Sequence, residues 1–448
     1  MKANSRCCGH YYVLASSYLV VFLAAVCSGF SSSSSPPNPL SDFDYMTNDE
    51  LPWHPEGYQT WAWKDGRNIN YIEMGDPTKP ALLLIHGFGA SSYHFRYNIP
   101  ALARSGYHVF AFCKLGFGLS TKPIDIEYSP DIWMEQTSDF IKEVINNGNG
   151  NGNSGSGSKP TTLVGNSIGG FTAMYTAAYA DDDVKDLING VVLLNAAGRF
   201  KTPDHENEMK KENTKEGVDV GPIAAIVEFV TTTIQRSIIA GSFMVTKQPV
   251  RIKQILKQVY PINDTNVNDK LVESIRYPSD DSNASEVFYR VITKNSGKNG
   301  AYVDDVLATL KADTKRDVPI LLCWGESDPW IRSEAADTIQ SLYPNTIRTS
   351  IDAGHCPHDG TFNTFVWQLL ITHRSLGRIN RYRSPPSSSP HPTYPSLCFS
   401  IVFPLLQFTR YNTSCRHVRG TTCCEYCNQK FHGSNSAAEI TIDGLLRF

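Results

Sequence analysis

The sequence predicts an α/β protein, built as a mainly parallel sheet with helices on both faces and an inserted helical lid. Short apolar runs alternate with segments in which apolar residues recur at helical spacing, and this alternation is typical of a parallel sheet. Asp65-Gly66 joins two strand-like segments, 61–64 and 67–74, and this dipeptide favours a two-residue hairpin turn. The sheet is therefore expected to begin with an antiparallel pair.

Six further strands are predicted after the hairpin. Each is a short run of mostly apolar residues, as expected for strands covered on both faces, and they span 81–85, 108–112, 161–164, 191–194, 320–324 and 347–351. Helical spacing marks segments between them, among them 131–145 and 333–342. The folded domain is expected to span 51–375.

Residues 199–313 interrupt this alternation and predict the lid. Pro222 suits the first turn of a helix, the apolar residues after it recur at helical spacing, and segments 250–259 and 267–275 continue the helical pattern. The apolar face of the lid either covers a lipid-like substrate or packs on the main domain, and we expect both uses for different residues. Ile223, Val227 and Val230 are the candidate substrate contacts. The sequence leaves open whether this face also docks on a membrane.

The two ends of the chain differ from the body. Lys2 and Arg6 precede an apolar stretch, so that residues 1–29 resemble a secretory signal peptide, with an uncleaved anchor as the alternative. Residues 30–50 are interpreted as a disordered presequence or linker, and 146–158 as a flexible insertion of Asn, Gly and Ser. Residues 376–448 are expected to be a disordered tail or an extension that arises from a frame or splice error.

The leader also bears on the destination of the protein. Phe30 follows its small-residue end, as in the two-part plastid presequences of algae with secondary plastids. The expected location is therefore the plastid, with association with the thylakoid left open and the secretory pathway as the alternative. Acidic residues within 42–50 argue against a transit peptide. The body has few cysteines, which favours a reducing compartment.

Composition argues against two classes of function. The net charge is −3 and no basic stripe is present, so nucleic acid is not an expected partner. No apolar run reaches the roughly 18 residues of a clear membrane span. A hydrophobic content of 41% is ample for one large globular domain.

The strongest functional signal is the sequence Gly-Asn-Ser-Ile-Gly at 165–169. It follows an apolar strand and precedes a helix-like segment, and strand, sharp turn and helix together predict a nucleophile elbow. Glycines let the backbone bend tightly enough to hold the side chain of Ser167 in an exposed pose. Ser167 is therefore the candidate nucleophile.

A serine hydroxyl needs a base to activate it, and that base needs an acid to orient it. His355 is the candidate base, on the loop after the last predicted strand, and Asp328 is the candidate acid, just past the end of a strand. The chain order Ser167, Asp328, His355 is that of one large hydrolase class. Glu326 remains an alternative acid and His358 an alternative base.

Two backbone N–H groups are expected to form the oxyanion hole, those of Phe88 and Ile168. Phe88 lies in His-Gly-Phe-Gly directly after the strand 81–85, and Ile168 follows the nucleophile. His86 is expected to brace that loop and to transfer no proton. Trp330, two residues beyond Asp328, is a further candidate substrate contact.

These motifs together resemble the α/β-hydrolases of plants and algae, and within them the chlorophyll dephytylases, with the pheophytinases as more distant relatives. The resemblance covers about 53–359, lid included, and rests on segments 86–91, 95–100, 115–118, 164–171, 194–198, 264–269, 325–330 and 353–359. It implies the α/β-hydrolase fold and hydrolysis of the ester that joins phytol to a tetrapyrrole propionate. The reaction would pass through an acyl-enzyme on Ser167 and would need no cofactor and no metal.

The expected activity is therefore cleavage of a hydrophobic carboxylic ester, with a chlorophyll-type pigment as the expected substrate. A general lipid or carboxylic esterase is the first alternative, and a non-catalytic protein that binds phytol or pigment on the same fold is the second. Dehalogenase and epoxide hydrolase chemistry is disfavoured because those relatives have an Asp nucleophile where Ser167 stands. The chain departs from the relatives in two places: Cys113 replaces an Asp, and the sequence after Asp359 is unlike theirs. Asn195 stands where some other relatives keep their acid, so that position offers no carboxylate.

Overall fold

The computed structural model describes residues 38–146, 158–202, 222–294 and 301–361, with the side chains of 222–230 and 294 left out. All of these residues lie within one compact unit of the chain. The predicted leader (1–29), the tail (376–448) and nearly all of the insertion at 146–158 lie outside the described residues. Within the described ranges, no helix has both the length and the apolar character needed to cross a membrane.

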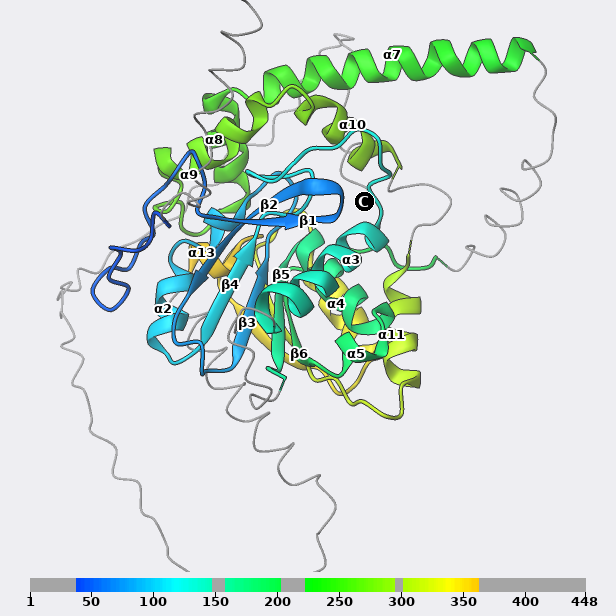
Figure 1. The fold of residues 1–448 in the computed structure, drawn as a ribbon. Helices are drawn as coiled ribbons and strands as arrows, with labels where there is room; N and C mark the ends of the chain where they lie inside the picture. The colour runs from blue at the N-terminus through cyan, green and yellow to red at the C-terminus, as the bar shows by residue number, and fades with distance from the viewer. Residues whose placement is uncertain (1–37, 147–157, 203–221, 295–300, 362–448) are drawn as a thin grey trace, which may run out of the picture. The chain divides into compact units, whose positions relative to one another are not determined.

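An eight-stranded sheet forms the centre of the described chain (Figure 1). The strand order is β1-β2-β4-β3-β5-β6-β7-β8; β2 pairs antiparallel with β1 and β4, and the other pairs are parallel. The strands are β1 (Gln59–Trp63), β2 (Arg67–Met74), β3 (Ala81–Ile85), β4 (His108–Phe112), β5 (Thr161–Asn166), β6 (Ile188–Leu194), β7 (Ile320–Gly325) and β8 (Ile347–Ile351). The predicted mainly parallel sheet, begun by a hairpin, is confirmed.

The hairpin turn contains the two residues that its sequence favours, but it is one residue longer than the predicted two-residue turn. Lys64–Gly66 connect the strands, Asp65 and Gly66 both adopt positive φ, 57° and 73°, and Trp63 pairs with Arg67 across the turn. Two successive positive φ angles match the right-handed twist of the flanking strands. This turn sets the register of β1 on β2.

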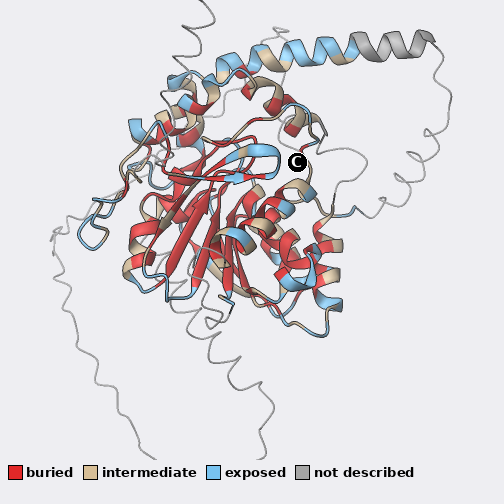
Figure 2. Cartoon of the chain, in the orientation of Figure 1, coloured by how far each residue is buried: buried red, intermediate tan, exposed pale blue. Residues whose placement is uncertain are grey.

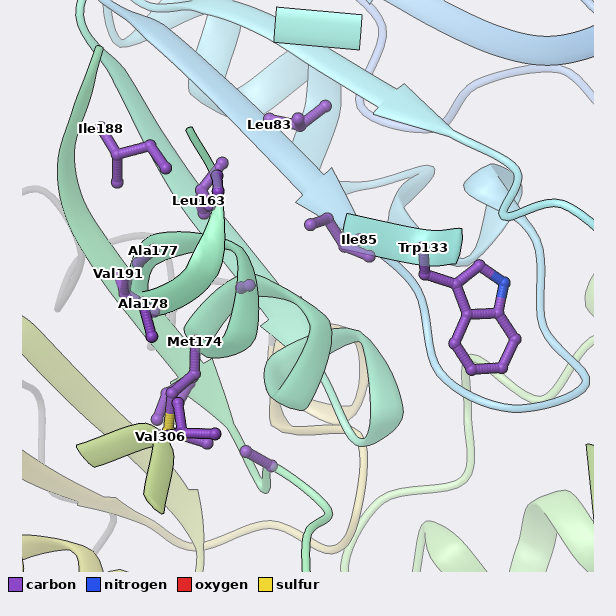
Figure 3. Close-up of a cluster of buried hydrophobic side chains, with 14 of the residues drawn as sticks. Leu83, Ile85, Trp133, Leu163, Met174, Ala177, Ala178, Ile188, Val191 and Val306 are labelled. Atoms are coloured by element: carbon purple, nitrogen blue, oxygen red, sulfur yellow. The ribbon is translucent and has the colours of Figure 1, made fainter. Parts of the chain in front are cut away.

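Alternate residues of each central strand contact opposite layers of helices. Leu83 and Ile85 face one layer, formed by α3 (Pro130–Phe140), α4 (Ile168–Tyr179), α11 (Val303–Ala312) and α12 (Ser333–Leu342). Figure 3 shows Trp133 of α3, Met174 of α4 and Val306 of α11 in this layer. Leu82 and Leu84 face the other layer, which contains α2 (Asn98–Arg104) and part of the N-terminal segment. Both faces of the sheet are therefore covered, which explains the uninterrupted apolar runs.

The lid is inserted between β6 and β7, as predicted, but it is shorter than 199–313. Its helices are α7 (Pro222–Thr246), α8 (Pro249–Val259), α9 (Asp269–Arg276) and α10 (Ala284–Lys294). The last helix of the predicted range, α11, packs on α4 and α12 through Val306 and Leu310 and so belongs to the main domain. Figure 2 shows that the described side chains of α7 are mostly exposed.

The prediction of disorder at 30–50 is wrong for residues 38–50. Leu40 is buried in the core on the α2 side, and Arg104 donates to the main-chain carbonyls of Tyr45 and Asn48 at 2.7 and 2.8 Å. The polar composition of residues 38–50 suggested a linker, but main-chain carbonyls of this segment accept the hydrogen bonds that hold it on the domain. Such contacts cannot be predicted from composition, because every residue has the same carbonyl group.

Candidate active site

Ser167 occupies the tight turn between β5 and α4. Its φ is 54° and its ψ is −123°, a backbone conformation that residues other than glycine rarely adopt. A Cβ on Gly165 would lie 2.2 Å from the carbonyl oxygen of Gly169, and one on Gly169 would lie 2.1 Å from that of Ile85. Only glycine fits at these two positions, and the turn holds Ser167 at the end of the central strand.

His355 and Asp328 form a short hydrogen bond beside this turn. His355 Nδ1 lies 2.7 Å from Asp328 Oδ2, and both side chains are buried. Because a carboxylate only accepts, Nδ1 carries the proton in this pair and Nε2 is free to accept one. This is the arrangement that a base needs to activate a hydroxyl.

Asn166 joins the elbow to the loop of the base. Its side-chain amide donates to the carbonyl of His355 at 2.9 Å and to that of Leu194 at 3.0 Å. On the other side, a Cβ on Gly87 would lie 3.2 Å from the Cβ of Ser167. The structure therefore brings Ser167, the base loop and the loop of Phe88 together at one end of the sheet.

Asn195 supports the acid, a role that the sequence analysis missed. Its amide donates to Asp328 Oδ2 at 2.7 Å and to the carbonyl of Gly325 at 3.1 Å, and its own oxygen accepts from the Gly325 N–H at 2.8 Å. Asn195 itself has a positive φ of 42°. Its position at the end of β6, next to β7, was the available signal, since neighbouring parallel strands end at the same edge.

The candidate oxyanion donors lie on both sides of Ser167. In the described part of the chain, the N–H groups of Phe88 and Ile168 donate to no protein acceptor. Phe88 follows β3, and Ile168 is the first residue of α4. Their role in binding an oxyanion stays a prediction.

Aromatic side chains extend from this site toward the lid. The ring of Trp330 is partly exposed and its centre lies 5.1 Å from that of His355. The ring centres of Phe88 and Phe288 of α10 lie 5.5 Å apart, and those of Phe288 and Phe243 of α7 lie 5.2 Å apart. The predicted substrate contacts Ile223, Val227 and Val230 belong to α7, but their side chains lie outside the described residues.

The two alternative site residues have other partners. Glu326 is partly exposed and contacts Ser350 and Arg348, and the hydrogen bond from Ser350 is the main cause that lowers the pKa of its carboxyl. His358 is fully buried against His94, and burial lowers its pKa to about 3. Neither geometry suits the acid or the base.

His86 braces the Phe88 loop, in the manner expected. Its Nδ1 donates to the carbonyl of Gly87 at 2.7 Å, and its Nε2 accepts from the N–H of Lys114 at 3.0 Å. Burial lowers the pKa of His86 to about 3, so that the ring is neutral. The Sγ of Cys113, where relatives have an Asp, lies 3.4 Å from both the main-chain nitrogen and the hydroxyl oxygen of Ser92.

Lys114 is fully buried next to this brace. Its Nζ lies 3.0 Å from Thr172 Oγ1 and 3.8 Å from the centre of the Trp133 ring. Burial lowers the pKa of Lys114 well below its usual value. The folded protein therefore loses the Lys114 proton at a lower pH than the unfolded chain does, and folding is penalised at pH values below about 10.4.

We expect Lys114→Met to raise the free energy of unfolding at pH 7 by about 1–3 kcal/mol, because the stem stays and the buried amine is removed. Urea unfolding at pH 7 and pH 9.5 measures this. The advantage of the variant should shrink at the higher pH, because the proton that Lys114 loses on folding is released to the solvent at a smaller cost there. Lys79→Met on an exposed turn is the control, and a less stable Lys114→Met at both pH values would contradict the expectation.

Among the described residues, no three His, Cys, Asp or Glu side chains gather as ligands for a metal ion. The chemistry available at this end of the sheet is that of a serine, an oriented imidazole and a buried carboxylate.

Comparison with known proteins gives a family and several relatives. Residues 80–360 match the family model described as the alpha/beta hydrolase fold. The chain is 28% identical to the chloroplastic pheophytinase of Arabidopsis thaliana over 336 residues, 66% of this chain and 62% of that protein. It is 24% identical to Lipase 3 of a Moraxella species over 65% of this chain and 76% of the lipase. The match thus spans less than two thirds of the pheophytinase.

Solved structures share the fold at low sequence identity. A membrane phospholipase A described as a bacterial virulence factor matches with a TM-score of 0.51 and 20% identity, covering 82% of this chain and 98% of that one. A meta-cleavage product hydrolase of Pseudomonas fluorescens matches with a TM-score of 0.51 and 19% identity, covering 72% and 99%.

Proposed function

The chain belongs to the α/β-hydrolase family, and from this premise we propose that it is a serine hydrolase that cleaves a hydrophobic carboxylic ester. The observation that carries the proposal is the 2.7 Å bond between His355 and Asp328, on loops that adjoin the turn of Ser167. Without that bond the imidazole would have no fixed tautomer. The arrangement is the one that activates a serine hydroxyl.

In the proposed reaction, His355 Nε2 takes the proton of Ser167 as the hydroxyl oxygen attacks the ester carbonyl. The tetrahedral oxyanion is held by the N–H groups of Phe88 and Ile168. The proton then passes from His355 to the leaving alkoxide, and the alcohol departs from the acyl-enzyme. Water, activated by the same imidazole, cleaves the acyl-enzyme and restores Ser167.

We propose the phytol ester of chlorophyll or a related tetrapyrrole as the substrate, with a tetrapyrrole acid and phytol as products. The match to a chloroplastic pheophytinase supports this, since it covers two thirds of the chain. The contacts of Phe88, Phe288 and Phe243 also support a large apolar substrate between the site and the lid. The same match supports a plastid location.

A general esterase is the alternative, favoured by the match to a Moraxella lipase. A rat epoxide hydrolase is 38% identical, but only over 82 residues, which are 18% of this chain and 14% of that protein. We do not extend its reaction to this chain, because an epoxide hydrolase needs an Asp where Ser167 stands. A protein that only binds pigment would not require the bond between His355 and Asp328.

Labelling with a fluorophosphonate probe tests the proposal, with the adduct expected on Ser167. Incubation with chlorophyll, with pheophytin and with p-nitrophenyl esters of increasing chain length then separates the substrates. Release of phytol supports the tetrapyrrole ester, and activity on short esters without phytol release supports the general esterase. Folded protein that forms no adduct would contradict both.

We further propose that the lid associates peripherally with a membrane. Exposed apolar side chains gather on α7 and the start of α8, where Ile238, Val245 and Val250 are each more than 60% exposed. The stretch 231–263 carries five Lys and Arg residues and no Asp or Glu. Four of them form ion pairs with carboxylates of neighbouring segments: Arg236 with Glu286, Lys247 with Asp280, Lys253 with Asp269 and Lys257 with Asp264. We therefore expect binding mainly through insertion of the apolar side chains.

Co-sedimentation with vesicles of anionic lipid tests this proposal. We expect Ile238→Ser/Val245→Ser to lower the bound fraction at least about fivefold, because each exposed apolar side chain adds to the burial in the bilayer. Met46→Ser, at an exposed apolar residue of the N-terminal segment, is the control. Equal binding by both variants would contradict the proposal.

A further inference from the structure

Three residues from segments of the family resemblance contact one another beside the His355 loop, and none of them has a role in the proposed chemistry. Arg96 follows the short helical turn η2 (Ser92–Phe95), Asn266 lies between α8 and α9, and Asp359 lies in α13 (Pro357–Gly360). The side chain of Arg96 is fully buried, and it donates from Nη1 to Asp359 Oδ2 at 3.2 Å and from Nη2 to the carbonyl of Asn266 at 2.7 Å. Residues up to 263 positions apart in the chain are thereby joined.

Asp359 also connects to the lid. The hydroxyl of Tyr260 donates to Asp359 Oδ2 at 2.6 Å, and the amide of Asn266 donates to the main-chain carbonyl of Asp359 at 2.6 Å. His94 Nε2 lies 2.7 Å from the same hydroxyl. The carboxylate is thus held by the main domain and by the lid at once.

These contacts surround the loop of His355. The N–H of His355 donates to the carbonyl of Val259, the last residue of α8, at 3.0 Å. Asn98 donates from its amide to the carbonyl of His358 at 2.8 Å. Cys356, next to the base, packs in an apolar cluster with Leu256 of the lid. The base loop is therefore fixed on two sides.

Stability alone does not account for a buried ion pair at this place. Two apolar side chains of similar volume are often as stabilising as such a pair, because the pair loses its hydration when it is buried. Burial raises the pKa of Asp359, and the charge of Arg96 opposes that rise. What an ion pair adds is a single geometry, since its hydrogen bonds specify both distance and direction.

We propose that Arg96 and Asp359 are positioning residues that hold the His355 loop between the main domain and the α8–α9 half of the lid. The proposal rests on the proposed function, because it takes His355 as the base. The pair acts only through the loop, and we assign it no contact with the substrate. A further consequence is that α8 and α9 stay in place during turnover, since they support the base.

The test uses the full chain and the double variant Arg96→Met/Asp359→Asn. It removes both charges of the pair together and keeps an acceptor for the hydroxyl of Tyr260. Glu50, which also pairs with Arg96, is partly exposed and keeps its ion pair with Lys270. We expect kcat for a p-nitrophenyl ester to fall about 100-fold with KM little changed, because small displacements of a base have effects of this size. Labelling of Ser167 by the fluorophosphonate should slow in parallel.

Two further variants separate positioning from general support. Arg96→Lys keeps the charge beside Asp359, and its kcat should therefore lie between that of the double variant and that of the wild type. Asp139→Asn is the control: it weakens a hydrogen bond from the buried Trp63 and an ion pair with Lys64, but lies on α3, away from the base loop. It should lower the melting temperature and leave kcat unchanged.

The outcomes distinguish this proposal from the proposed function. Wild-type protein that is not labelled at Ser167 would overturn the proposed function and, with it, the role of the pair. Labelled wild type together with a folded double variant of wild-type kcat would overturn the positioning role alone. If the double variant does not fold, Tyr260→Phe, which keeps both charges, decides: unchanged kcat overturns the proposal and reduced kcat at unchanged KM supports it.

Discussion

Replacing Ser167 with alanine is expected to lower kcat for ester hydrolysis by about a million-fold while the protein stays folded. In the proposed mechanism the hydroxyl oxygen of Ser167 forms the covalent bond to the substrate, and alanine has no atom that can replace it. Alanine is no larger than serine, so the turn at φ 54° is unaffected. Hydrolysis of p-nitrophenyl esters measures the rate, and circular dichroism checks the fold.

Ser327→Ala provides a matched control for this variant. Ser327 is exposed, next to Asp328, and has the same hydroxyl but no place in the turn after β5. It should keep wild-type activity and the adduct on Ser167. A Ser167→Ala protein that retains more than about one hundredth of the wild-type rate would contradict nucleophilic catalysis by this residue.

Asp328→Asn is expected to lower kcat about ten-thousand-fold with little change in KM. The amide that replaces the carboxylate presents a donor toward His355 Nδ1, and the imidazole then adopts the wrong tautomer. Steady-state kinetics on the same ester measures both constants. Glu326→Gln, at the same strand end, should leave them unchanged; a large loss there instead would identify Glu326 as the acid.

The position of Asn195 allows a stronger form of this experiment. Its amide lies 2.7 Å from Asp328 Oδ2, so a carboxylate at 195 would stand one hydrogen bond away from the original acid. We expect the exchange Asn195→Asp/Asp328→Asn to recover at least about tenfold of the activity lost in Asp328→Asn, because the charge near the imidazole is restored. Asn195→Asp alone, which places two carboxylates together, should be less active than wild type.

Several elements of the fold could be predicted at nearly their observed bounds. The strands β3, β4 and β8 match the predicted ranges, and α12 does so too. Burial of both sheet faces imposes continuous apolar runs, and a helix imposes its own spacing, so that both leave a local record in the sequence. The elbow could be found for the same reason, since its glycines are adjacent in the chain.

Other features could not be predicted, because they depend on distant contacts. The support of Asp328 by Asn195 spans 133 positions, and the ion pair of Arg96 spans 263. The assignment of α11 to the main domain was missed as well, since its helical spacing is the same whether it packs on the lid or on α4. Nothing in the local pattern specifies the partner of such a residue.

The sequence by itself determined the order of strands and helices, the turn of Ser167 and the order of the candidate nucleophile, acid and base along the chain. Each of these depends on residues that are near one another in sequence, where backbone geometry and burial leave a direct pattern. Only the tertiary structure decided which of the two carboxylates faces His355, and which side chains hold its loop. Those choices are made by hydrogen bonds between segments far apart in the chain, and such bonds form only when the sheet aligns the ends of its parallel strands.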